Sequence, residues 1–209
     1  MRVVEKGFSV TKRIDGPMLS YGIVLENTSR FVAKLDVRIR MLDASGKAVK
    51  AMLVQPTAQL THTVDNIFPG ERYGVGYIVS TAGPDERARN VVKLEVKLVE
   101  VEWWPSKSTP MEYAVPRPFI RVKLDKMKVE PDKRSGGAAI RFTVVSSHKD
   151  AINDPYVRMV FRDKAGKVLG GADSTLNTVF PPGKSAAEVE IPHGVPDGID
   201  ESRSDVFFG

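Results

Sequence analysis

Apolar and charged residues alternate in several stretches of the chain. Val37, Ile39 and Met41 occupy every second position, and arginines lie between them. Side chains of a β-strand point alternately to its two faces, so this spacing predicts a strand with one buried and one solvated face. Helical periodicity of any length is missing from the chain. The pattern therefore predicts an all-β fold.

The same alternation returns at residues 92–98 and then changes phase. Apolar residues fall on even positions up to Leu98 and on odd positions from Val99 to Trp103. One extra residue in a strand produces such a change. We therefore expect a β-bulge near Leu98 or a strand that passes from one sheet to another.

The chain also resembles itself. Residues 37–47 align with residues 157–167, and Val, Arg, Asp, Gly and Lys recur in the two segments, with Arg38 matching Arg158. Both segments end in an Asp-x-x-Gly-Lys sequence. The Asp carboxylate can accept local backbone N–H groups and Gly can take a positive φ, so each sequence predicts a hairpin turn. Pro-Gly pairs at 69–70 and 182–183 mark a second pair of matching turns.

Short strands with turn signals between them, present twice, favour two antiparallel immunoglobulin-like β-sandwich domains in tandem. We assign residues 1–104 to the first domain and 119–209 to the second. The stretch between them is rich in Pro and Ser, which predicts a semi-rigid linker over residues 105–118.

The second half resembles the bacterial FxLYD-type domain. The resemblance rests on Val157-Arg158-Met159-Val160-Phe161-Arg162-Asp163, on the Asp163-x-x-Gly166-Lys167 hairpin and on the later Pro-Pro-Gly. The first half matches more weakly, with Met41-Leu42-Asp43 in place of the aromatic pair. The resemblance implies an immunoglobulin-like sandwich of an exported or envelope-associated protein. It implies no enzymatic activity and no catalytic residues.

The amino-acid composition excludes several kinds of functional site and segment. The chain contains no cysteine, which removes disulfides, thiolate metal sites and thiol nucleophiles. No stretch reaches the roughly 20 apolar residues that a membrane-spanning helix needs. Residues 1–13 lack the apolar centre of a secretory signal peptide, so either the protein stays in the cytoplasm or this chain is the mature part of an exported protein.

Positive charge is concentrated near the expected domain boundary. Residues 105–135 carry 8 basic and 4 acidic side chains, which gives +4 of the net charge of +5. A polyanion could bind the segment 117–134, with an adjacent tryptophan as a stacking platform. The alternative is that the basic residues lie on the solvated face of the first strand of the second domain, where lysines oppose aggregation. The candidate interaction surface comprises Trp103, Trp104, Arg117, Arg121, Lys123, Lys126 and Lys128.

Other candidate chemistry is weaker. The three histidines, His62, His148 and His193, have no metal-ligand spacing, and we predict no catalytic residue, cofactor or metal. Two acidic loops, at 150–154 and 197–201, offer oxygen ligands for calcium, but not in an EF-hand arrangement. Turn carboxylates that bind their own backbone are the alternative for both loops.

From these observations we expect a non-catalytic binding or spacer module of the bacterial cell envelope or secretome. It would present loops or an unpaired edge strand to an unknown protein or envelope polymer. Polyanion binding through residues 117–134 is the alternative, and nucleic acid is possible but not favoured as the partner.

Overall fold

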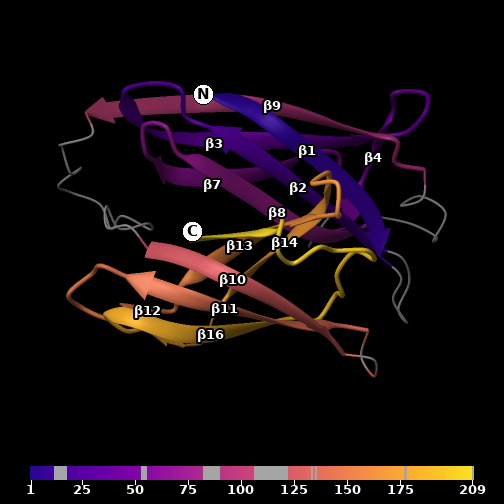
Figure 1. Cartoon of the computed structure of the whole chain (residues 1–209). Coiled ribbons are helices and arrows are strands. Elements are labelled where there is room, and N and C mark those ends of the chain that lie inside the picture. Colours follow the sequence, from indigo (N-terminus) through magenta and orange to yellow (C-terminus); the bar gives the residue numbers. More distant parts are fainter. Residues whose placement is uncertain are drawn as a thin grey trace.

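The computed structural model describes residues 1–11, 18–52, 56–81, 90–105, 122–132, 134, 136–176 and 178–208. Every regular element in these ranges is a β-strand, and neighbouring strands pair antiparallel (Figure 1). The all-β prediction is confirmed. The strands are β1 (Arg2–Thr11), β2 (Met18–Glu26), β3 (Phe31–Leu42), β4 (Ala48–Val49), β5 (Ala51–Met52), β6 (Pro56–Thr57), β7 (Leu60–Ile67), β8 (Arg72–Thr81), β9 (Lys93–Pro105), β10 (Val122–Pro131), β11 (Ala138–Ser146), β12 (Ile152–Asn153), β13 (Tyr156–Arg162), β14 (Val168–Thr175), β15 (Val179–Phe180), β16 (Gly183–Ile191) and β17 (Asp205–Phe208).

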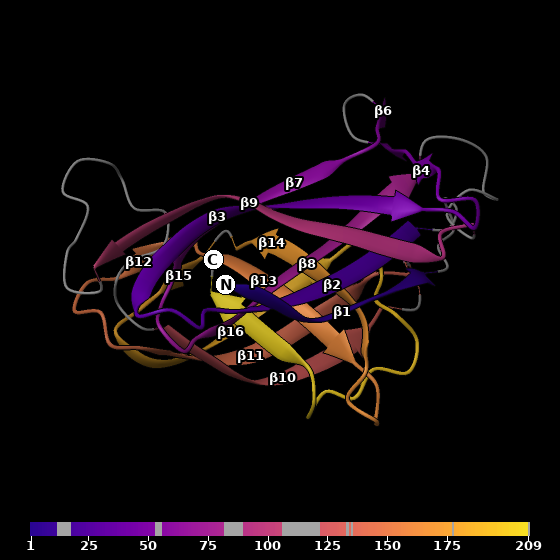
Figure 2. The same ribbon diagram turned by 90° about the horizontal axis from the view of Figure 1, so that it is seen from above.

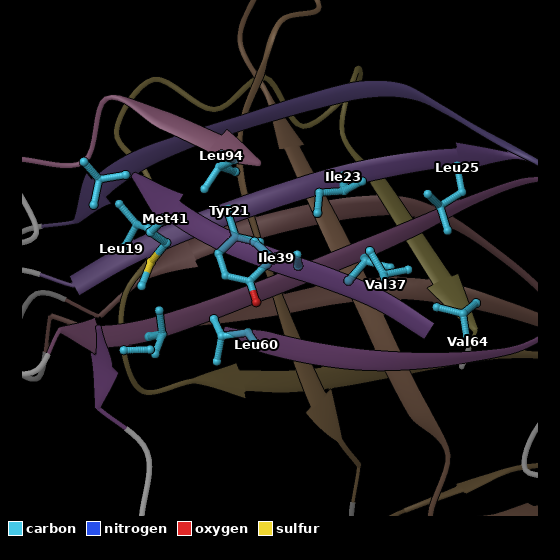
Figure 3. Packing of buried hydrophobic residues seen from close by; sticks show 14 of the residues in the cluster. Leu19, Tyr21, Ile23, Leu25, Val37, Ile39, Met41, Leu60, Val64 and Leu94 are labelled. Carbon is cyan, nitrogen blue, oxygen red and sulfur yellow. The ribbon is translucent and has the colours of Figure 1, made fainter. Parts of the chain in front are cut away.

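The first half contains two sheets that enclose one hydrophobic core. Its inner sheet has the order β1-β2-β8-β5-β6, and in its outer sheet β3 lies between β7 and β9, with β4 at one end. The large apolar side chains of both sheets meet between them (Figure 3). Residues of this core shown there include Leu19, Tyr21, Ile23, Leu25, Val37, Ile39, Met41, Leu60, Val64 and Leu94.

The second half repeats this layered plan. Its outer sheet has the order β10-β11-β16 and its inner sheet the order β14-β13-β17, while β12 and β15 form a short separate pair. The core between the two sheets contains Ile140, Phe142, Val144, Val157, Met159, Phe161 and Phe180 among other buried residues.

The two inner sheets pack against each other. Figure 1 shows the sheets in four layers, with the outer sheets at the top and bottom and the inner sheets between them. In the view from above in Figure 2, β13 passes beneath β2 and β8 at an angle to them. We call the contact between the inner sheets the seam. A small third cluster, formed by Val24, Val160 and Val168, lies in it.

The local predictions can be checked strand by strand. Asp43 accepts the backbone N–H of Ser45 and Lys47, and Gly46 has a φ of +82°, so the first hairpin turn is confirmed. The second turn is the same, with Asp163 as acceptor and Gly166 at +83°. The expected bulge in β9 lies at Glu100, two positions beyond Leu98, where the register against β3 shifts and φ is +52°.

Parts of the sequence-based division fall outside these ranges. The expected linker 105–118 lies outside the described residues, apart from Pro105, which ends β9. Among the described residues, no helix is long and apolar enough to cross a membrane.

Candidate functional site

Glycines line the first half's side of the seam. Gly7 on β1 pairs with Gly22 on β2, which pairs with Gly76 on β8, so three glycines lie side by side across the sheet. The backbone of β14 packs directly on them. A Cβ on Gly76 would lie 2.6 Å from the nitrogen of Ala172, and one on Gly171 would lie 2.5 Å from the Cα of Gly76. Any larger side chain at these positions would force the inner sheets apart.

Ser20 completes this backbone contact. Its Oγ donates a hydrogen bond to the carbonyl of Gly171 (2.8 Å) and accepts one from the N–H of the same residue (2.9 Å). Gly171 lies on β14, an edge strand that pairs only with β13 among the described strands. Ser20 is fully buried, and it satisfies edge groups that would otherwise lack a partner inside the protein.

An ion-pair network lies at one end of the seam. Arg162 of β13 is 7% exposed and binds Glu5 of β1 through Nη2 (2.9 Å) and Nε (3.1 Å). Arg162 also pairs with Asp205, and Glu5 also pairs with Arg72. Burial raises the pKa of Glu5, but the hydrogen bonds and charges of Arg162 and Arg72 outweigh it, so the net pKa is lowered. The network joins both halves through charge-assisted hydrogen bonds.

Arg158 connects the second half to both sheets of the first. Its Nη2 donates to the carbonyl of Thr63 on β7 (2.9 Å), and its guanidinium lies over the rings of Tyr73 (5.6 Å) and Tyr156 (5.3 Å). It reaches β7 because β8 pairs with β5 only at Ser80 and Thr81, which leaves the edge of β8 open near Tyr73. Its Nε has no hydrogen-bond partner in the described part of the chain.

A polar cluster surrounds this arginine. The hydroxyl of Tyr156 donates to the carboxylate of Asp173, and burial raises the pKa of both groups. On the other side, the Tyr21 hydroxyl lies 2.5 Å from Nε2 of His62. Burial, with the nearby charge of Arg158, lowers the pKa of His62 to about 4. The ring is therefore neutral near pH 7 and can accept the hydroxyl proton of Tyr21.

The hydroxyl groups of this cluster have their partners within their own halves. The Asp173 carboxylate is occupied by Tyr156, and the Tyr21 hydroxyl by His62. A small groove of about 240 Å³ runs beside Asp173 and Tyr77, with His193 on its rim. The contacts of this cluster that join the two halves are those of Arg158 with Thr63 and Tyr73.

The tryptophans of the predicted interaction surface lie near the end of β9. Trp103 is 43% exposed, and Trp104 is half-buried. They pair with Ala33 and Val32 of β3 in the outer sheet of the first half. The indole N–H of Trp104 is buried and has no acceptor among the described residues.

The lysines lie on a different sheet. Lys123, Lys126 and Lys128 are exposed on β10, in the outer sheet of the second half, with both inner sheets between them and β9 (Figure 1). Lys123 pairs with Asp125 at 3.2 Å. Arg117 and Arg121 lie outside the described residues. The structure therefore places the described members of the predicted surface at two separate locations.

The burial pattern of β10 follows the expectation of a strand with one solvated face. Lys123 and Asp125 are exposed, whereas Val122 and Leu124 are half-buried. The phase changes at Lys126, which has a φ of +57°, and Met127 is then buried in the second core.

In the acidic loop at 197–201, a carboxylate binds groups of its own turn. Asp200 accepts the N–H and the hydroxyl of Ser202, as a turn carboxylate does. Within the described ranges, no group of three or more His, Asp or Glu is arranged to hold a metal ion.

The seam was not foreseen from the sequence, although it left a signal there. In β2 and β8, small residues occupy every second position: Ser20 and Gly22 in one strand, Gly74 and Gly76 in the other. Glycine is unfavourable in a strand interior, so two strands with this alternation indicate a face that a second backbone approaches closely.

Comparisons with known proteins identify no family. No family model matches the chain, and no curated protein matches it. Among solved structures, red sea bream transglutaminase aligns with 99% of this chain and 31% of its own, at 13% identity and a TM-score of 0.24. The chain thus spans less than a third of that enzyme's length. A TM-score this low carries no argument about fold or activity.

Proposed function

We propose that this protein is a non-catalytic binding or spacer module built from two immunoglobulin-like sandwiches in tandem. The strand orders support the repeat. In the first half β2 lies between β1 and β8, and β3 lies between β7 and β9. In the second half β11 lies between β10 and β16, and β13 lies between β14 and β17. Corresponding strands follow in the same order along the chain.

The observation that carries the proposal is the glycine-lined seam. Flexible tandem domains usually meet through small, polar contacts. Here backbone packs on backbone, Ser20 binds Gly171, and Arg158 and Arg162 are buried against the other half. Such a contact fixes the angle between the halves. A fixed angle suits a protein that holds its outer edges and loops at a set distance for a partner.

The compartment and the partner class are part of the proposal. The resemblance of residues 157–167 to FxLYD-type domains favours the bacterial envelope or secretome, and a protein or an envelope polymer as the partner.

Polyanion binding through the basic segment 117–134 is the second candidate. One observation favours it: Lys126 and Lys128 are exposed, and neither has a carboxylate within 4.0 Å in the described ranges. Two observations weaken the case for polyanion binding. Asp125 pairs with Lys123, and the exposed Trp103 lies on another sheet.

A capture experiment distinguishes the two candidates. The purified chain is incubated with a lysate and an envelope fraction at low and high salt, beside a variant with Arg121, Lys123, Lys126 and Lys128 changed to Ser. A defined protein or envelope polymer that is retained at high salt supports the module. Capture that is lost with salt and in the variant supports polyanion binding instead, because phosphate contacts weaken steeply with salt.

A further inference from the structure

β16 forms one edge of the outer sheet in the second half. Among the described strands it pairs only with β11, over the nine residues from Gly183 to Ile191. On its other side, the backbone N–H and C=O groups of alternate residues face away from β11, and no described strand pairs with them. In Figure 1, β16 lies at the lower margin of the molecule, at the opposite edge of its sheet from β10.

The edge on β16 lacks two devices that commonly protect an edge strand. A bulge or an inward-pointing charge prevents a further strand from pairing. The register of β16 against β11 is continuous, so the strand has no bulge. Its residues that face the core, Ser185, Ala187 and Val189, carry no charge. The backbone of β16 is therefore regular enough to pair with a further strand.

The burial pattern shows which part of this edge is open. Every residue from Gly183 to Glu188 is exposed or half-buried, including the core-facing Ala187. The inner sheet approaches β16 at its other end, where Ser174 of β14 lines the same small groove as Glu190 and Ile191. The open stretch of the edge is therefore residues 183–188.

The charges along the open stretch are complementary to themselves. Its solvent-facing residues are Lys184, Ala186 and Glu188. If two copies pair antiparallel with Ala186 opposite Ala186, Lys184 of each copy lies opposite Glu188 of the other, and two ion pairs flank the centre. A shift by one residue would set solvent-facing residues against core-facing ones. Glu188 also binds Arg141 through Oε2, and its carboxylate has a second oxygen for the lysine.

We propose that two copies of this chain pair through β16 about a two-fold axis at Ala186, which joins their outer sheets into one continuous sheet. The same surface is used by both copies, as a two-fold contact requires. Main-chain hydrogen bonds provide the affinity, and the pairs of Lys184 with Glu188 fix the register. The inference goes beyond the proposed function, because the occupant of this edge is a second copy of the chain and not the partner of the module.

The first test is the concentration dependence of the mass in sedimentation equilibrium. One chain has a mass of 23.0 kDa, and we expect twice this mass at high concentration. Lys184→Glu turns both ion pairs into repulsions, so the dissociation constant should rise at least about tenfold. The control is Lys128→Glu, which makes the same change of charge at an exposed lysine on β10 and should leave the constant unchanged. Far-UV circular dichroism shows that each variant is folded.

The second test locates the axis by cross-linking. The chain has no cysteine, so Ala186→Cys introduces a single thiol. Residues directly opposite each other in an antiparallel pair have Cα atoms about 4.5–5.5 Å apart, which a disulfide can bridge. The control is Val145→Cys, a 41% exposed position beside Lys184 on β11, whose two copies would be at least about 14 Å apart across the axis. On mild oxidation, we expect a covalent dimer with Ala186→Cys and none with Val145→Cys.

Three results would overturn the proposal. One is a chain that stays monomeric up to about 1 mM. Another is a dimer that Lys184→Glu does not weaken. The third is cross-linking of Val145→Cys as fast as that of Ala186→Cys, which would mean that the copies meet through another surface. If a monomeric chain still retains a partner in the capture experiment, the module stands and only the β16 pairing fails.

Discussion

β3 and β13 have the same sequence pattern and opposite surroundings. Each is the central strand of its sheet, and Arg38 matches Arg158 when residues 37–47 are aligned with residues 157–167. The Arg38 side chain is 37% exposed and pairs with Glu100 on the neighbouring strand at 2.5 Å. Arg158 is 7% exposed and donates to the carbonyl of Thr63 in the other half. One arginine lies on a solvated face and the other lies in the seam.

The difference shows that alternation reports only one face of a strand. In both strands the odd positions fill a core, with Val37 and Ile39 in the first half and Val157 and Met159 in the second. What covers the even positions depends on a partner sheet from a distant part of the chain. The glycines of β2 and β8 allow that sheet to approach β13, and no corresponding sheet covers β3 among the described residues.

The largest expected effect comes from filling the glycine row. Gly76→Val should reduce the free energy of unfolding by at least about 3 kcal/mol, because its Cβ would overlap the Met159 carbonyl oxygen and the backbone of Ala172. Urea unfolding followed by circular dichroism measures the change. Valine is favoured over glycine in a strand, so a substitution that acted only through strand propensity would stabilise the protein. A variant as stable as wild type or more so would show that the sheets do not meet at Gly76.

The next effect is a pH dependence caused by His62. Its pKa is about 4 in the folded chain, against about 6.5 in an unfolded one, so the unfolded state binds more protons between these values. The contribution of His62 to the free energy of unfolding is fully present above pH 6.5 and falls as pH decreases toward 4. Relative to His62→Gln, wild type should lose about 3 kcal/mol of unfolding free energy between about pH 7 and about pH 4.

Urea titrations of both proteins at several pH values provide this measurement. A difference between wild type and His62→Gln that stays constant with pH would mean that His62 is not held neutral beside Tyr21 and Arg158.

A matched pair of substitutions tests the comparison itself. Arg158→Met should cost about 2 kcal/mol, since the Thr63 carbonyl loses its donor. Arg38→Met should cost less than about 0.5 kcal/mol, because an exposed ion pair contributes little. Both values come from chemical denaturation under the same conditions. Equal losses in the two variants would contradict the assignment of different surroundings to the two strands.

The smallest expected effect is at the end of the seam. Glu5→Gln should lower stability by about 1 kcal/mol near pH 7, because Arg162 and Arg72 lose a charged partner. The folded pKa of Glu5 is lowered, so its contribution is present above the unfolded pKa of about 4.3 and is lost as pH falls through the folded value. The stability difference should therefore close in acid. A stability difference between wild type and Glu5→Gln that persists in acid would mean that the loss of stability comes from altered packing and not from the lost charge.

Local structure was predictable because its causes are local. The Asp43 and Asp163 turns depend on a carboxylate and a glycine three residues apart, and the bulge at Glu100 depends on a phase change in one strand. The seam was not predictable in the same way. Gly7, Gly76 and Gly171 are far apart in the sequence, and only the folded chain brings them together.

Of the candidate interaction surface, too, only the part with a local cause could be predicted from the sequence. The exposure of Lys123 followed from alternation along one strand, whereas that of Lys128 depends on the phase change at Lys126, which the sequence analysis did not predict. The separation of the two lysines from Trp103 did not follow from alternation, because sequence proximity near the boundary says nothing about which sheet each strand joins. That β16 forms an edge was also missed, since this depends on which of the described strands pair with it.

The most direct test of a rigid, fused pair is whether the two halves unfold together. Both tryptophans lie in the first half, on β9, so their fluorescence reports that half, while far-UV circular dichroism reports the strands of both. Urea unfolding is followed with both signals on the same sample. A seam that couples the halves predicts coincident transitions with one midpoint. Two separated midpoints would contradict the account, because the halves would then be independent domains that touch without stabilising each other.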